Sequence, residues 1–223
     1  MAQLSRDEFD AIEFGAARTA DHRGAALRMS QLAATSAPTG DMSSAEAHLR
    51  AGEQWLLADD PAEAANSFRQ ALAAGGATLV DARVSLARAL FLLGRSDEAK
   101  ELISQVEAAG RRDPRQCDLV AELLVEQSDL IGALDWANTG VELCLPDNAR
   151  AGGSAPGPAA SPGAGPGASP GARGADAPGA LVPLQVPPTV DRNELRMLLS
   201  LRYRIRNDMG LPEDDYDKLL DDL

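Results

Sequence analysis

Apolar residues between about residue 44 and residue 147 recur every three or four positions, in segments separated by short breaks. This spacing predicts amphipathic α-helices that alternate with tight turns. The breaks hold residues that start or stop helices: Pro61 lies at a predicted helix start, Gly94 ends a predicted helix, and Ser96 is expected to cap the next one. The pattern therefore predicts a series of helices joined by short turns.

The same region contains three similar segments. Positions 35 and then 34 residues apart hold matching small or apolar residues: Gly52, Ala87 and Ala121; Trp55, Leu90 and Leu124; and Ala64, Ala99 and Ala133. Two antiparallel helices joined by a tight turn approach closely, so small residues are needed where they cross. Larger apolar residues nearby then fill the space up to the next unit. Repetition at this period indicates helical-hairpin repeats.

Two stretches show the strongest likeness to a known family, DDPAEAANSFRQAL and GRSDEAKELI. They resemble the tetratricopeptide repeat, a helix–turn–helix unit of about 34 residues. The resemblance implies an all-α solenoid of antiparallel helix pairs, with three repeats at about 44–78, 79–112 and 113–147. The first repeat departs from the family pattern, because His48 stands where the family prefers Trp.

Residues 1–43 are expected to form N-terminal helices. In the family frame, apolar residues fall at the positions expected of a fourth, degenerate repeat: Phe9, Ile12, Ala16, Ala25, Met29 and Leu32. Glu13, however, occupies a site that should be small. The pattern fits both a repeat-like helix pair and unrelated capping helices.

Residues 148–190 differ in composition from the rest of the chain. Within 151–190 there are nine Gly, nine Pro and ten Ala, and only Arg173 and Asp176 are charged. Such a segment buries too little apolar surface to offset the entropy lost on ordering. We therefore expect a disordered linker between the repeats and the C-terminal residues.

Residues 191–223 are predicted to form an amphipathic helix followed by an acidic tail. Asp191 with Glu194 is a helix-capping arrangement, and Gly210 followed by Pro212 is a stop signal, so the helix is expected over 191–209. A single amphipathic helix is marginally stable alone and must dock on something. Three placements fit the pattern: a cap on the open end of the array, occupation of the groove of the array, or a linear motif for another partner.

The chain is acidic, with 21 basic and 34 acidic residues and a formal net charge of −13. A negative chain repels phosphate backbones, so neither nucleic acid nor an anionic membrane is expected as the main partner. No stretch approaches 18 apolar residues, and the first residues lack the pattern of a signal peptide, which favours a cytoplasmic location. The frequent use of Ala, Gly, Pro and Arg resembles that of bacteria with GC-rich genomes.

Few residues suit catalysis or metal binding. The only histidines, His22 and His48, show no ligand spacing and form no catalytic set with a nucleophile. Cys117 and Cys144 fall on apolar helix faces, where a free thiol behaves as a small apolar group. The sequence therefore predicts a protein that is not an enzyme, with no cofactor and no metal site.

The family resemblance implies a concave groove lined by the first helix of each repeat. The groove positions that it implies are Glu46, Leu49, Glu53 and Leu56 in the first repeat, Asp81, Val84, Arg88 and Phe91 in the second, and Arg115, Asp118, Glu122 and Val125 in the third. Family members that grip a chaperone's C-terminal carboxylates have Lys, Asn and Arg on this face. Those residues are absent here, so no carboxylate clamp is expected.

Apolar groove positions flanked by acids suit a partly hydrophobic, basic peptide or helix. We therefore expect a non-catalytic adaptor that binds a protein partner in this groove. The alternative is a self-assembling or autoregulated structural subunit, in which the C-terminal helix caps the array and a homo-oligomer forms. Ordinary solvated helix faces would give the same pattern of groove residues.

Overall fold

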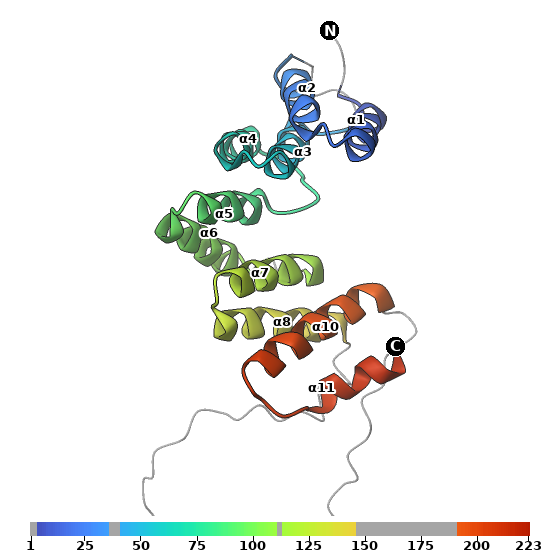
Figure 1. Ribbon diagram of the computed structural model, residues 1–223, viewed down its shortest axis with the longest axis vertical. Helices are drawn as coiled ribbons and strands as arrows, with labels where there is room; N and C mark the ends of the chain where they lie inside the picture. Colours follow the sequence, from blue (N-terminus) through green and yellow to red (C-terminus); the bar gives the residue numbers. More distant parts are fainter. Residues whose placement is uncertain (1–3, 36–40, 111–112, 146–190) are drawn as a thin grey trace, which may run out of the picture.

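A computed structural model describes residues 4–35, 41–110, 113–145 and 191–223, and these residues are helical with no strand among them (Figure 1). The helices are α1 (Arg6–Thr19), α2 (His22–Thr35), α3 (Ser44–Leu57), α4 (Pro61–Ala74), α5 (Ala82–Leu92), α6 (Ser96–Ala108), α7 (Pro114–Glu126), α8 (Leu130–Cys144), α10 (Arg192–Asp208) and α11 (Asp215–Lys218), followed by the 3₁₀-helix η1 (Leu219–Asp222). The all-α prediction is confirmed.

Consecutive helices pack as pairs, and the pairs stack along the long axis of the molecule (Figure 1). The pairs are α1 with α2, α3 with α4, α5 with α6, and α7 with α8. Neighbouring pairs are also in contact, since α2 packs against α3, α4 against α5, and α5 against α7. This arrangement is a helical-repeat solenoid.

Small residues let the two helices of a pair approach each other, as their spacing predicted. A Cβ atom added to Gly52 of α3 would lie 2.4 Å from Cε1 of Phe68 in α4. Ala87 and Ala121, at the equivalent positions of α5 and α7, are fully buried. The matching aromatic and aliphatic residues, Trp55 and Leu90 among them, belong to the same continuous apolar core.

The turns follow the predicted chemistry except at one position. Asp60 caps α4 through the backbone N–H of Glu63, Pro61 is the first residue of that helix, and Gly94 has a φ of 72° that favours glycine. The predicted cap at Ser96 is wrong. Arg95 occupies the N-cap position without a capping side chain, and its guanidinium binds the Glu98 carboxylate instead, with Nε 2.6 Å from Oε1.

The N-terminal pair stacks on the first repeat. Phe9, Met29 and the other predicted apolar positions are buried or half-buried around a core shared with α3. Glu13, the residue that did not fit the repeat pattern, accepts a hydrogen bond from Nε of the buried Arg50 in α3 at 2.8 Å, and Asp10 binds the same guanidinium. The pair is thus joined to α3 by buried charge as well as by apolar contacts.

The C-terminal helix α10 packs against α7 and α8, at the end of the stack opposite the N-terminus (Figure 1). A Cβ atom added to Gly140 of α8 would lie 2.6 Å from Cδ2 of Leu198 in α10 and 2.9 Å from Cβ of Cys117 in α7. Asp191 caps α10 by accepting from two backbone N–H groups, and Gly210 ends it with a φ of 69°. The linker predicted over 148–190 lies outside the described residues.

Candidate functional site

A pocket of about 150 Å³ lies where α3, α5 and α7 meet on one face of the solenoid. Its lining residues are Glu53, Leu56, Val80, Val84, Ser85, Arg88, Arg115, Leu119, Glu122, Leu123 and Glu126. Aliphatic side chains from all three helices contribute to it, and charged side chains stand beside them. A groove with an apolar surface and a charged margin is suited to bind a peptide or a helix by its apolar face.

The charges around this pocket are only partly paired with one another. Arg88 of α5 and Glu126 of α7 form an ion pair, with Nη2 2.9 Å from Oε1. Glu53, Arg115 and Glu122 form no ion pair with any other residue in the part of the chain described. These two carboxylates and one guanidinium are therefore available to a bound partner.

Glu53 of α3 lies in a crowded part of the pocket. Its side chain retains accessible surface, yet the walls of the groove surround it, and this desolvation raises its pKa to about 7, with the nearby carboxylates of Glu13 and Glu46 adding to the effect. A cation placed beside Glu53 would stabilise the ionised carboxylate, and the ionised carboxylate would bind that cation more tightly than the protonated form does. The groove thus has a site that prefers a basic group.

Half of the residues that the sequence assigned to the groove line this pocket. They are Glu53, Leu56, Val84, Arg88, Arg115 and Glu122. The structure places the others outside it: Glu46, Leu49, Asp81, Phe91, Asp118 and Val125. Their placement follows from the packing of each first helix against its neighbours.

Three of these six have structural contacts in the first two repeats. Leu49 is 1% exposed and belongs to the core. Glu46 accepts a hydrogen bond from the backbone N–H of Leu79, with Oε2 2.8 Å from the nitrogen. Asp81 caps α5 and forms an ion pair with Arg83 at 2.6 Å. These side chains therefore have structural roles: Leu49 in the core, Glu46 between two repeats and Asp81 at the start of α5.

The remaining three are covered by neighbouring elements. Phe91 is 9% exposed within the core, and Val125 is half-buried against it. Asp118 is 8% exposed at the side of α7 on which α10 packs. Burial raises the pKa of Asp118 to about 6, and the carboxylates of Glu122 and Glu194 add to the increase. The docked helix α10 thus accounts for the burial of this carboxylate.

Sequence reasoning missed five of the lining residues, namely Val80, Ser85, Leu119, Leu123 and Glu126. Ser85 lies three positions before Arg88, Leu119 lies four positions after Arg115, and Glu126 lies four positions after Glu122. The helical period was thus a signal for them, because residues three or four positions apart share a helix face. Val80 precedes α5, and the repeat pattern gives no signal for it.

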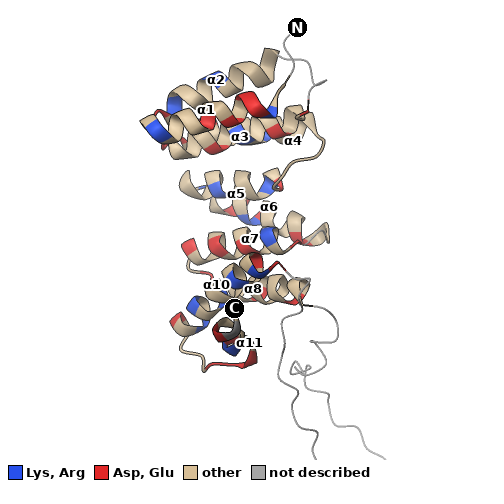
Figure 2. Ribbon diagram, turned by 90° about the vertical axis from the view of Figure 1, so that its right-hand side faces the viewer, with Lys and Arg blue, Asp and Glu red and all other residues tan. Residues whose placement is uncertain are grey.

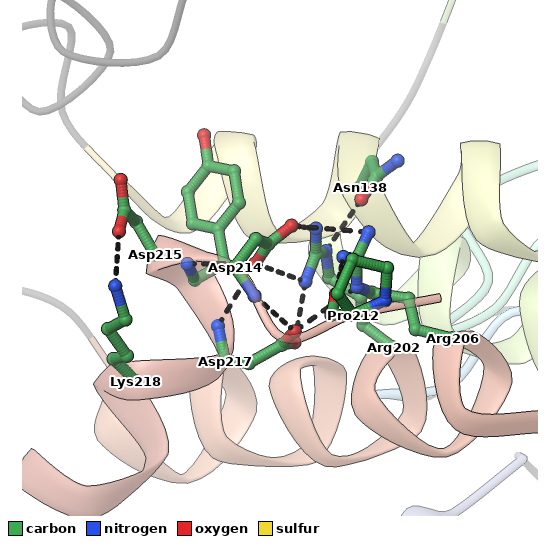
Figure 3. A network of polar contacts seen from close by, with 9 residues as sticks. Asn138, Arg202, Arg206, Pro212, Asp214, Asp215, Asp217 and Lys218 are labelled. Carbon is green, nitrogen blue, oxygen red and sulfur yellow. Dashed lines mark hydrogen bonds and ion pairs between the residues drawn. The ribbon is translucent and has the colours of Figure 1, made fainter. Parts of the chain in front are cut away.

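A network of buried charge fixes the C-terminal tail on α10 (Figure 3). Arg202 is 3% exposed and donates to Oδ1 of Asn138 in α8 at 2.7 Å and to Oδ1 of Asp217 at 2.7 Å. It also binds Asp214, and Arg206 donates to Oδ2 of Asp217 at 3.1 Å. Arg202 therefore joins three segments: α8, α10 and the tail.

The carboxylate of Asp214 is held ionised in this network. Burial alone would raise its pKa, but hydrogen bonds from Arg202 and the positive charges of Arg202 and Arg206 keep the pKa below its ordinary value. A group of this kind stabilises the folded state at neutral pH and loses that contribution as the pH falls through its folded-state pKa. The tail is thus fastened most firmly above the acidic range.

No group of three or more His, Cys, Asp or Glu side chains within the described residues is arranged to hold a metal ion. Cys117 is buried and Cys144 half-buried, and neither is joined in a disulfide bond. Burial, with Glu194 and Asp191 nearby, raises the pKa of Cys144 to about 11, so this thiol stays protonated at neutral pH. Among the described helices, none is both long and apolar enough to cross a membrane.

Comparison with known families gives one match. Residues 56–123 match the model of a family described as tetratricopeptide repeat, over a stretch that runs from the end of α3 into α7. No curated protein and no solved structure matches the chain. Except for Glu53 and Glu126, the residues that line the pocket all lie within the matched stretch.

Proposed function

We propose that the chain is a non-catalytic adaptor, because residues 56–123 match the tetratricopeptide repeat family, whose members generally bind other proteins. Its partner is a peptide or helix that lies in the groove formed by α3, α5 and α7. The single observation that supports this most strongly is the pocket itself, where aliphatic side chains from three successive first helices meet beside unpaired charges.

The apolar part of the groove favours a partner with at least one large aliphatic or aromatic side chain. Leu56, Leu119 and Leu123 come from two different helices, so one apolar side chain of a partner would contact both. Each buried methylene contributes about 0.8 kcal/mol. Contacts of this size with several groove residues are needed to offset the entropy that a flexible peptide loses on binding.

The charged part favours a partner with Lys or Arg next to that apolar residue. Glu53 and Glu122 lack an ion-pair partner among the described residues, whereas Arg88 is already paired with Glu126. Since the pKa of Glu53 is about 7, its charge develops as the pH rises through neutrality. Affinity for a basic partner should therefore increase between pH 6 and pH 8.

A second candidate is a structural subunit in which the C-terminal helix caps the array. The packing of α10 against α7 and α8 supports the capping part of this alternative. Self-assembly through that end is less well supported, because α10 and its tail already cover it (Figure 1). The two functions are compatible, since α10 contributes no lining residue to the pocket.

Selection of displayed random peptides on the immobilised full-length chain tests the proposal. We expect one class of selected peptides to combine an apolar residue with Lys or Arg, and the binding of this class to strengthen from pH 6 to pH 8. The double substitution Glu53→Gln with Glu122→Gln should weaken binding and remove the pH dependence. Failure to select any peptide with a basic residue, or basic peptides whose binding this substitution leaves unchanged, would contradict the proposed partner chemistry of the groove.

A further inference from the structure

The outward face of α10 is basic in an otherwise acidic protein. Buried residues of this helix lie on one side, and the opposite side exposes Arg192, Asn193, Arg196, Met197, Ser200, Tyr203, Arg204, Asn207 and Asp208. Three guanidinium groups and one carboxylate thus share this face. Figure 2 shows blue segments along α10, below the red segments on α7.

The five arginines of α10 divide into two groups. Arg202 and Arg206 point to the tail, where Asp214 and Asp217 bind both of them. Arg192, Arg196 and Arg204 form no ion pair with any residue that the structure describes. The fold therefore holds two of these arginines in ion pairs and leaves the other three without one among the described residues, although the charge of Arg204 acts on the carboxylate of Asp118.

Local helix energetics do not favour two of the unmatched arginines. Arg192 lies in the first turn of α10, where the helix dipole disfavours a positive charge. Arg196 follows it by four residues, and like charges at that spacing repel each other on a helix surface. Residues that weaken local structure without a gain in packing are typical of positions with a functional role.

Apolar side chains accompany the arginines on this face. Met197 is 60% exposed and Tyr203 is 42% exposed, although both belong to types that are usually covered. Arg192 and Arg204 are twelve residues apart on a helix that rises 1.5 Å per residue, so the face extends over about 18 Å. That length suits a short peptide segment.

We propose that the outward face of α10 is a second docking surface, which binds an acidic segment of a partner protein through Arg192, Arg196 and Arg204. Carboxylates of that segment pair with the guanidinium groups, and an apolar residue of the segment contacts Met197 or Tyr203. Guanidinium groups bind carboxylates with two parallel hydrogen bonds, which gives such a surface specificity as well as charge.

The charge of the whole protein favours an acidic peptide over nucleic acid. With a net charge of −13, the protein repels a long polyphosphate chain, whereas a short acidic segment contacts only the local basic face. A second copy of the chain has the same negative charge and is likewise repelled. The surface is separate from the pocket of α3, α5 and α7, so this inference goes beyond the groove and its basic partner.

The test compares peptide-display selections on three immobilised full-length proteins. These are the wild type, the variant with Arg196→Glu and Arg204→Glu, and a control with Arg18→Glu and Arg69→Glu. The control makes the same charge change at two other exposed arginines that lie in α1 and α4. All substituted side chains are exposed, and circular dichroism checks that each protein folds.

We expect the wild type and the control to enrich peptides rich in Asp and Glu, and the α10 variant to lose them. A synthetic peptide from that set should bind the α10 variant at least tenfold more weakly, as measured by fluorescence polarisation. The groove variant Ser85→Trp should retain its affinity for this peptide. Loss of acidic-peptide binding in Ser85→Trp alone would assign the acidic ligand to the groove and overturn the inference.

Three other results would also overturn it. One is equal enrichment of acidic peptides on all three proteins. Another is that a single-stranded DNA oligomer binds the wild type more tightly than any selected peptide does and does not bind the α10 variant. That result would make the face a nucleic-acid site. The third is that light scattering shows a dimer for the wild type and no dimer for the α10 variant. That result would mean that a second copy of the chain occupies the face.

Discussion

Replacing Gly140 of α8 by Ala probes the contact that holds the C-terminal helix on the array. The new Cβ would meet Cδ2 of Leu198 at 2.6 Å and Cβ of Cys117 at 2.9 Å, both closer than carbon atoms approach in real structures. Leu198 is fully buried between the helices. Either α10 must move away from α8 or the side chains must leave their preferred rotamers.

The expected cost follows from two opposing effects. Overpacking a filled core by one methyl group costs about 1–3 kcal/mol. Ala in place of Gly in a helix interior returns up to about 1 kcal/mol. We therefore expect Gly140→Ala to lower the free energy of unfolding by about 1–2 kcal/mol, measured by circular dichroism during urea denaturation.

A matched control separates the contact from helix propensity. Gly15 also lies within a helix, in α1, and a Cβ added there meets nothing within 4 Å. Gly15→Ala should therefore raise the free energy of unfolding by roughly 0.5–1 kcal/mol. The two Gly→Ala substitutions have opposite expected signs, although their chemistry is identical.

A double-mutant cycle assigns the cost to α10. Leu198→Ala alone should cost about 2–5 kcal/mol, because it leaves a cavity at a fully buried position. In the double variant the methyl group added by Gly140→Ala enters that cavity, so the combined loss should be smaller than the sum of the two by about 1 kcal/mol or more. Additive effects, or a stabilising Gly140→Ala, would refute the packing of α10 on α8.

Two further substitutions test the charged groups that α10 encloses. Asp118→Asn should raise the free energy of unfolding at pH 8 by about 2 kcal/mol, because the pKa of Asp118 is raised from 3.8 to about 6 in the folded protein. The folded state binds this proton more tightly than the unfolded state, so the free energy of unfolding of the wild type falls as the pH rises from about 4 to about 6. Urea titrations at several pH values would contradict this if the free energy of unfolding changed with pH equally in both proteins. Asp217→Asn leaves the buried Arg202 without the more buried of its two carboxylate partners and should cost roughly 3 kcal/mol, seen as about hundredfold faster hydrogen exchange in α10 and the tail. The control Lys218→Gln removes only an exposed ion pair with Asp215 and should leave exchange unchanged; equal effects of the two would show that the network does not hold the tail.

The repeats could be predicted from the sequence because their signal is local and periodic. Gly52, Ala87 and Ala121 mark where the helices of each pair cross, and the structure buries all three. Pro61 and Gly94 likewise act through their own backbone geometry. Features of this kind depend on a few neighbouring residues, so the pattern alone reveals them.

The residues that line the pocket could be predicted only in part, because burial there depends on helices that are distant in the chain. The family frame treats Leu49 and Glu53 as equivalent in exposure, yet Leu49 is core and Glu53 retains accessible surface. Asp118 is covered by α10, which follows it by more than seventy residues. No periodic pattern within α7 indicates that cover.

The buried network of the tail was also outside the reach of the sequence. The acidic tail was recognised from the sequence, but its pairing with the arginines of α10 was not. Arg202 lies on the apolar side of its helix, and its partners include Asn138 of α8. Only the docked position of α10 brings these groups together, and that position is a result of tertiary packing.

The measurement that tests the central claim most directly is the affinity of a selected basic peptide for a chain whose groove is blocked. Ser85 lines the pocket on α5, and Ser85→Trp should fill it. Ser104→Trp is the control, because Ser104 is exposed on α6 and lines none of the groove. Isothermal titration calorimetry should show at least tenfold weaker binding to Ser85→Trp and unchanged binding to Ser104→Trp. Equal affinity for the wild type and for Ser85→Trp would contradict the assignment of the groove as the partner site.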